Sequence, residues 1–152
     1  DSGLRIRSLT DPTKKMSKSS DDNKSKIILI DNPDEAVKKI MGATTDSVGS
    51  IHFDWDKQPG ITSLLQILAL LSGRDQTEVN SEWENKENYG DFKKAVAESV
   101  RNFLVDFQSK FKSITDEQIL AKLEQSERDL APIANVTLLK AQQAVGLRPK
   151  GD

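Results

Sequence analysis

Two lysines and two serines lie close together near the start of the chain, in the stretch KMSKS, Lys15–Ser19. Lys15 and Lys18 offer two ammonium groups, and Ser17 and Ser19 add hydroxyl groups that donate or accept hydrogen bonds. Ammonium groups on flexible stems act as compact positive charges, which suit the phosphates of a nucleotide. The stretch is therefore a candidate site for binding polyphosphate.

Several other kinds of site are excluded by the residue types present. The chain has no cysteine, which removes disulfides, thiolate metal sites and cysteine nucleophiles, and which fits a reducing cytosol. Its single histidine, His52, rules out a His-rich zinc site. The glycine-rich pattern GxxxxGK[ST] is also absent, so a phosphate-binding loop here would have to close around its ligand.

Positive charge is concentrated at the N-terminal end. Residues 1–30 carry seven basic and four acidic side chains, a net charge of +3, whereas the remaining residues carry 15 basic and 20 acidic ones, a net charge of −5. This end is where an anion would bind, and a solvated basic tail is the alternative interpretation of the same charge run. The longest apolar run, Ile61–Leu71, is shorter than the roughly 20 residues that span a bilayer.

The elements that would position this loop are mainly helices. Apolar spacing and capping residues predict helices over residues 33–42, 59–73, 75–87 and 91–112, and from Thr115 onward. Asn32, Asp75 and Thr115 are expected N-caps, the latter two with Glu78 and Gln118 completing capping boxes. Because proline lacks an amide hydrogen, Pro132 predicts a break, with a final helix ending at Val145.

In one segment, apolar residues alternate with polar ones and no longer follow helical spacing. Ile51, Phe53 and Trp55 alternate with His52 and Asp54, which predicts a short strand with His52 on the polar face. In the helix over residues 91–112, a stripe of apolar side chains is expected to be core: Phe92, Val96, Val100, Phe103, Phe107 and Phe111. The predicted fold is a mainly α bundle of about five helices with a short strand element, preceded by a flexible basic loop outside the core.

The loop is part of a longer match. The stretch GLRIRSLTDPTKKMSKS (residues 3–19) resembles the segment of bacterial tryptophanyl-tRNA synthetases that carries the second signature of class I aminoacyl-tRNA synthetases. The likeness continues through ATTDSVGSIHFD, KQPGITSLLQILALLSG and YGDFK, as far as AVGLRP. Tyrosyl-tRNA synthetases usually carry phenylalanine and glycine in this loop, where this chain has Met16 and Ser17.

The resemblance implies roles for individual residues. Lys15 and Lys18 would be the catalytic residues that bind the leaving pyrophosphate, and Ser17 and Ser19 would add hydroxyl contacts. The backbone at Ile6 would border the adenine, and Met16 would complete the ATP-binding set. ATP with Mg²⁺ would be the substrate, with no metal site on the chain itself.

The resemblance also implies partners: tryptophan, ATP and tRNA(Trp) for a cytoplasmic, homodimeric full-length enzyme, with no membrane and no DNA. Residues 1–30 would end a Rossmann-type catalytic domain, and residues 31–152 would form the helical anticodon-binding domain. No tRNA-binding residue is assigned. Lys93, Lys94, Arg101 and Lys112 are exposed candidates, each of which a solvated helix face also explains.

A second class I signature, of the H-x-G-H type, has no match, because the only histidine lies in IHFD. We therefore expect the chain, whose first residue is not methionine, to be a piece of a longer enzyme and catalytically incomplete alone. The alternatives are a stand-alone helical module, derived from a synthetase, that binds RNA or protein, and a tyrosine-specific relative.

Overall fold

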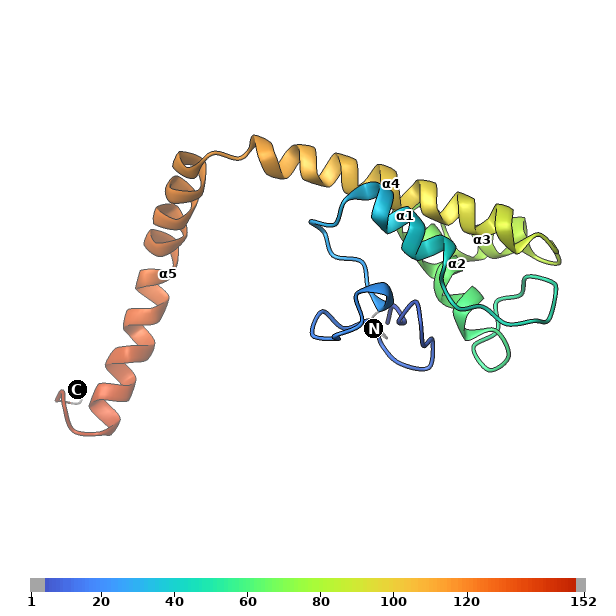
Figure 1. Cartoon of the computed structure of the whole chain (residues 1–152). Helices are drawn as coiled ribbons and strands as arrows, with labels where there is room; N and C mark the ends of the chain where they lie inside the picture. Colours follow the sequence, from blue (N-terminus) through green and yellow to red (C-terminus); the bar gives the residue numbers. More distant parts are fainter. Residues whose placement is uncertain (1–4, 150–152) are drawn as a thin grey trace. The chain divides into compact units, whose positions relative to one another are not determined.

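The computed structural model describes residues 5–149, so that Gly3 and Leu4 of the resembling stretch lie outside the described residues. It contains a short 3-10 helix (Asn23–Ser25) and five α-helices: α1 (Pro33–Met41), α2 (Pro59–Ser72), α3 (Gln76–Trp83), α4 (Tyr89–Ser113) and α5 (Asp116–Ala144) (Figure 1). The chain divides into two compact units, residues 1–109 and 110–152, which are described separately. The prediction of a mainly α fold with about five helices is confirmed.

The helix ends follow the capping residues closely. The Asn32 side chain accepts hydrogen bonds from the amides of Asp34 and Glu35, and α1 begins with Pro33. Gly73 ends α2 in the left-handed conformation that glycine adopts without strain. Thr115 and Gln118 form the predicted capping box of α5. The capping box predicted at α3 is incomplete, because Asp75 caps the helix while Glu78 pairs with Arg74 at 2.9 Å instead.

The core of the first unit surrounds α2. Most side chains of α2 are buried, which confirms the expectation from its nearly continuous apolar surface. Gly60 allows this burial, because a Cβ there would clash with the carbonyl oxygen of Thr44. Trp83 of α3 packs against Phe92 of α4 with ring centroids 5.1 Å apart, and Arg101 of α4 pairs with Asp34 of α1.

The apolar stripe on α4 belongs to the core only in its first half. Phe92, Val96 and Val100 are buried as predicted, together with Leu104. Phe103 is 38% exposed and Phe111 is 61% exposed, so the prediction of core positions is wrong for these two. Ala97 is buried as well, and after Val100 the buried face continues to Leu104 and leaves Phe103 partly exposed.

The predicted strand over residues 51–55 does not form. Ile51 is fully buried and exchanges backbone hydrogen bonds with Asn85 and Lys86, but the bonding stops there. Side chains near the start of α2 take the next backbone amides: Gln58 Oε1 accepts from His52 at 2.7 Å, and Thr62 Oγ1 accepts from Asp54 at 2.9 Å. The segment is extended, but its backbone amides bond to side chains where the amides of a β-strand would bond to a neighbouring strand.

The break predicted at Pro132 is also wrong, because α5 runs from Asp116 to Ala144 with Pro132 inside it. Proline removes one helical hydrogen bond, but ending the helix there would leave several amide and carbonyl groups unpaired at two new termini. Ala131, which would have to cap the second helix, is a poor N-cap. Within residues 5–149, no helix has the length and apolar character needed to cross a membrane.

Candidate functional site

The Lys15–Ser19 loop is anchored at its first residues by a short antiparallel contact. Arg7 and Lys15 form an isolated β-bridge, the Ser8 amide donates to the Lys14 carbonyl at 2.9 Å, and the Met16 amide donates to the Ile6 carbonyl at 2.9 Å. The structure thus brings Ile6 and Met16 together, two residues of the predicted ATP-binding set. Their side chains also line a common apolar cavity of about 210 Å³ with α2 and α4.

The two lysines of the loop differ from their neighbour Lys14. Both are exposed, and within residues 5–149 neither ammonium group has a hydrogen bond or ion pair. Lys14 instead pairs with Asp11 at 2.9 Å. Hydrogen bonds from Thr13 and Lys14 lower the pKa of Asp11 to about 2, and the Asp11 carboxylate raises the pKa of Lys14. Lys15 and Lys18 therefore remain available to an anion, whereas Lys14 is neutralised.

The tip of the loop is a turn whose backbone carbonyls are held by a buried lysine. Ser17 and Ser19 have hydroxyl oxygens 3.0 Å apart, and the Ser20 amide donates to the Ser17 carbonyl at 3.2 Å. The buried ammonium of Lys26 donates to the Lys18 carbonyl at 2.9 Å and also to the Ser20 carbonyl. Lys26 was missed by the sequence reasoning, because its partners are backbone carbonyls, which no side-chain pattern reveals.

The segment around the loop packs on the helical core, which corrects the expectation that it lies outside. Leu9 is 4% exposed and belongs to the core cluster, and its backbone bonds to Ser25 and Thr44 at 2.9 and 2.7 Å. The Arg7 amide donates to Ser63 Oγ in α2 at 3.1 Å. The prediction underestimated this packing because a few apolar residues spaced through a polar stretch, Leu9 with Ile6 and Met16, are enough to anchor it.

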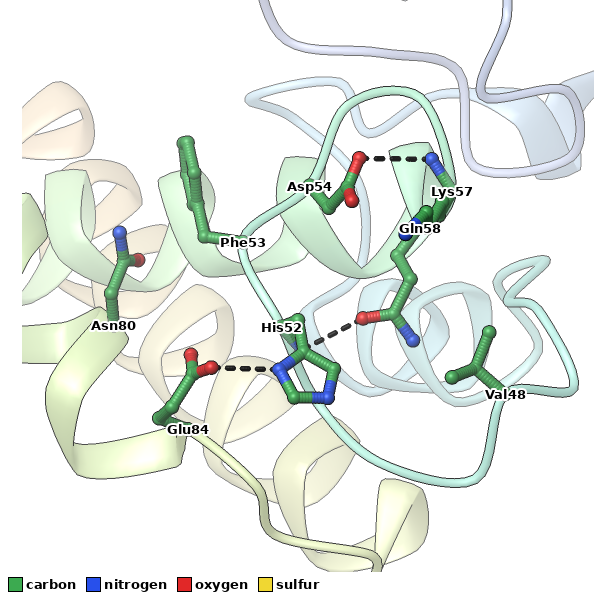
Figure 2. A pocket seen from close by; sticks show the side chains of 8 residues that line it. All are labelled: Val48, His52, Phe53, Asp54, Lys57, Gln58, Asn80 and Glu84. Atoms are coloured by element: carbon green, nitrogen blue, oxygen red, sulfur yellow. Dashed lines mark hydrogen bonds and ion pairs between the residues drawn. The ribbon is translucent and has the colours of Figure 1, made fainter.

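A second site lies away from the loop, beside the segment predicted as a strand. It is an open pocket of about 610 Å³, lined by His52, Phe53 and Gln58 together with Asn80 of α3 and Glu84, the residue that caps the end of α3 (Figure 2). His52 Nδ1 lies 2.7 Å from Glu84 Oε1, and its Nε2 lies 2.8 Å from Ser50 Oγ. The prediction that His52 is a surface residue agrees with its side chain being 35% exposed.

A buried polar network supports the wall of this pocket. The Gln58 amide donates to Asp46 Oδ1 and to the Ser50 carbonyl, each at 2.8 Å, and Tyr89 donates to Asp46 Oδ1 at 2.7 Å. Burial alone would raise the pKa of Asp46, but the hydrogen bonds from Gln58 and Tyr89 outweigh it and lower that pKa. Burial and the Asp46 carboxylate raise the pKa of Tyr89 to about 12.

Three of the four basic side chains considered as exposed candidates already have partners within the described residues. Lys93 is partly buried and donates to the Ala43 carbonyl at 2.7 Å, and burial lowers its pKa. Lys94 pairs with Asp91 and Arg101 pairs with Asp34, at 3.1 and 2.9 Å. Lys112 is exposed. Among the residues placed by the structure, no three His, Cys, Asp or Glu side chains gather in a way that could hold a metal ion.

Comparisons with known proteins agree with the resemblance. The family model "tRNA synthetases class I (W and Y)" matches residues 4–105. The tryptophan–tRNA ligase of Caldanaerobacter subterraneus is 40% identical over 145 residues, which cover 95% of this chain and 44% of that protein. The corresponding ligase of Helicobacter pylori is 41% identical, with the same coverage.

A solved structure gives the same result for the fold. The tryptophanyl-tRNA synthetase of Mycoplasma pneumoniae matches with a TM-score of 0.81 and 36% identity, covering 93% of this chain and 45% of that one. The chain thus spans less than half the length of the relatives that it matches. It belongs to the family of class I tRNA synthetases for tryptophan and tyrosine.

Proposed function

We propose that this chain is the C-terminal part of a tryptophan–tRNA ligase and supplies the loop that binds the pyrophosphate of ATP. The observation that carries the proposal is the state of Lys15 and Lys18, which are exposed and have no partner among residues 5–149, on a loop with an anchored backbone. The alignment with tryptophan–tRNA ligases along 95% of the chain supports it. Both lysines would act on ATP held by the remainder of the enzyme.

The reaction needs charge stabilisation more than proton transfer. The tryptophan carboxylate attacks the α-phosphorus of ATP, a new carboxyl oxygen–phosphorus bond forms, and the bond to the β-phosphate oxygen breaks as pyrophosphate leaves. Negative charge grows on the leaving group, and positioned cations stabilise it. Lys15 and Lys18 supply these cations, Ser17 and Ser19 add hydroxyl contacts, and the Ile6 backbone and Met16 border the adenosine.

Closure of the loop would make the lysines effective. An ammonium group 4 Å from a phosphate charge gains only about 1 kcal/mol in bulk water, but about 4 kcal/mol where the effective dielectric constant is near 20. The exposed positions of Lys15 and Lys18 correspond to the first situation. We therefore propose that the loop moves onto bound ATP and excludes water there.

Mg²⁺ would arrive with the nucleotide. The loop offers ammonium and hydroxyl groups, whereas Mg²⁺ prefers carboxylate and phosphate oxygens. The nearby Asp22 carboxylate already accepts from Thr10 and from the Lys24 amide. The loop residues thus fit the phosphates and not the ion, and the ion, when bound, would neutralise charge on the phosphate oxygens.

The remaining proposals concern the whole enzyme. Residues 1–30 would end its catalytic domain, and residues 31–152 would form the domain that binds the anticodon of tRNA(Trp). The full-length protein would be a cytoplasmic homodimer, and this chain alone would be inactive. A tyrosine-specific relative is the second candidate, because the matching family model covers both amino acids.

The test is exchange of labelled pyrophosphate into ATP, with tryptophan or tyrosine as the amino acid. It compares this chain with a protein extended upstream to the full length of the relatives. We expect exchange only in the extended protein and only with tryptophan. Exchange with tyrosine instead would establish the second candidate. A folded extended protein that is inactive with both amino acids would overturn the proposal and favour an RNA- or protein-binding module.

A further inference from the structure

Met16 lies where the Lys15–Ser19 loop meets the helical core. Its side chain is partly buried, packs against the core cluster and lines the apolar cavity of about 210 Å³ together with Ile6. Its amide donates to the Ile6 carbonyl at 2.9 Å, a hydrogen bond of the antiparallel contact described above. The side chain and the backbone of Met16 therefore hold the loop at the same place.

The cavity accommodates a thioether but offers no partner to a more polar group. Among residues 5–149, the side chains that line it are aliphatic or aromatic apart from Met16 itself, and none of them can donate a hydrogen bond. A polar atom placed there would lose its hydrogen bonds to water without gaining others, which is unfavourable. A chemical change that makes the Met16 side chain polar should therefore expel it from the cavity.

Hydrogen peroxide makes this change to methionine. A lone pair of the sulfur attacks one peroxide oxygen, the oxygen–oxygen bond breaks, and the proton of the transferred oxygen passes to the departing hydroxide, which leaves as water. The sulfur is oxidised by two electrons and the peroxide is reduced by two. The product, methionine sulfoxide, carries an oxygen that accepts hydrogen bonds, and methionine sulfoxide reductases return it to the thioether.

Met41, the other methionine of the chain, lies in different surroundings. It is the last residue of α1, is 37% exposed and lines a cleft with Lys94, Arg101 and Asn102. These three side chains carry N–H groups that can donate to a sulfoxide oxygen, and solvent reaches the same position. Oxidation of Met41 should therefore leave the packing of the first unit unchanged, which makes Met41 an internal control.

We propose that Met16 is a reversible oxidation site, at which a peroxide frees the Lys15–Ser19 loop from α2 and α4. The sulfoxide turns out of the apolar cavity to reach water, and the adjoining backbone moves with it. Lys15 and Lys18 then lose the fixed starting position that the antiparallel contact gives them. Any effect on the reaction with ATP rests on the proposed function, whereas the oxidation and the freeing of the loop do not.

The first measurement locates the oxidation. The folded, unaltered chain is treated with hydrogen peroxide and digested, and the gain of one oxygen is followed at Met16 and at Met41 by mass spectrometry. We expect Met16 to react within about tenfold of the rate of Met41, because susceptibility follows exposure and both side chains are at least partly exposed. A reaction at Met16 slower than this would overturn the proposal.

The second measurement follows the loop by hydrogen exchange at two amides of the antiparallel contact. The Met16 amide bonds to the Ile6 carbonyl and the Ser8 amide bonds to the Lys14 carbonyl. Oxidation should lower the protection of both amides by about tenfold, while the buried amides of α2 keep theirs, and the reductases should restore it. Unchanged protection in chains oxidised at Met16, or no protection of these amides before treatment, would overturn the proposal.

Met16→Leu and Met41→Leu separate the two methionines. Leucine has nearly the volume of methionine, suits an apolar cavity and resists peroxide. After the same treatment, the Met41→Leu chain should lose protection as the unaltered chain does, and the Met16→Leu chain should keep it. Equal losses in the two variants would contradict the proposal. If circular dichroism shows that Met16→Leu does not fold, Met41→Leu decides alone, because Met16 is then its only methionine.

The third measurement tests the consequence for activity in the extended protein. Pyrophosphate exchange after peroxide treatment is compared with the untreated rate of the same protein. We expect a loss about tenfold greater in the unaltered protein than in Met16→Leu, because small displacements of positioning groups are costly, and recovery with the reductases. Equal losses would overturn control of the reaction by Met16. If the loop lysines proved unnecessary for exchange, the proposed function would fail while hydrogen exchange would still decide on the oxidation site.

Discussion

At the scale of single residues, Lys26 shows how a buried charge can serve a loop instead of a ligand. Its ammonium group is buried and donates to the carbonyls of Lys18 and Ser20, so it holds the loop tip by its backbone. The side chains of Lys15 and Lys18 are thereby left free to point outward. One lysine of this region thus supports the loop backbone, while two others stay exposed.

Lys26→Met should destabilise the protein, because two carbonyls lose a charged donor. Hydrogen bonds to charged groups contribute about 1.5–3 kcal/mol, so we expect the free energy of unfolding in urea to fall by roughly 2 kcal/mol. Lys24→Met is the matched control at an exposed lysine, where the change should stay within about 0.5 kcal/mol. Equal effects of the two substitutions would show that Lys26 does not support the loop.

Tyr89 allows a direct titration, since it is the only tyrosine of the chain. Burial and the Asp46 carboxylate raise its pKa from 10.0 to about 12. The folded state thus favours the neutral hydroxyl, and the resulting stability is fully present below pH 10 and is lost as the pH rises toward 12. Ultraviolet absorbance at pH 11 should show mostly un-ionised tyrosine, and Asp46→Asn should move the midpoint back toward 10.0. A midpoint near 10.0 in the folded, unaltered protein would contradict the buried network.

At the scale of elements, local patterns predicted the helices well because caps and apolar spacing act within a few residues. Asn32, Asp75 and Thr115 each cap the helix that the sequence assigned to them. The strand prediction was wrong because its outcome depended on distant groups, the side chains of Gln58 and Thr62. Alternation of apolar residues reports burial, but it does not identify the hydrogen-bond partner.

The candidate site residues also divide into those that a local pattern reveals and those that depend on contacts between distant segments. Lys15 and Lys18 could be singled out from their types and spacing, and the structure adds that both are exposed and have no partner in the part of the chain that it describes. Asn80 and Glu84 were missed, because polar residues in the last turn of a helix and at its C-cap usually belong to solvated surface. Only their position across from His52 makes them part of a pocket. That position depends on how α3 packs, which no local pattern encodes.

The N-terminus of α5 offers a test of element stability without tertiary burial, because none of its described residues is buried. Thr115→Ala removes the capping box and should lower the opening free energy at the Gln118 and Ile119 amides by about 1 kcal/mol in hydrogen exchange. Ser126→Ala is the matched control inside the helix. Its hydroxyl bonds to the Lys122 carbonyl, and alanine there should leave or raise protection. Equal losses for both substitutions would contradict the capping role of Thr115.

At the scale of the whole molecule, the chain spans 44% of the length of a matching relative, and within its first unit the Lys15–Ser19 loop and the helices share their packing. Leu9, Ile6 and Met16 connect the loop to α2 and α4 through the core and the apolar cavity. We expect this packing to set where the loop rests before ATP binds. A movement of the loop would then change its contacts with α2 and α4, which belong to the domain that we propose binds tRNA.

The most direct test of the central proposal is tryptophan-dependent pyrophosphate exchange in the extended protein, measured for three lysine variants. Lys15→Ala and Lys18→Ala should each lower the rate by about 10²-fold to 10³-fold, the usual loss when a positioned donor to the transition state is removed. Lys14→Ala is the control, since Lys14 is already paired with Asp11, and should stay within about threefold. Rates for Lys15→Ala and Lys18→Ala that match the control would contradict a role for this loop in binding pyrophosphate.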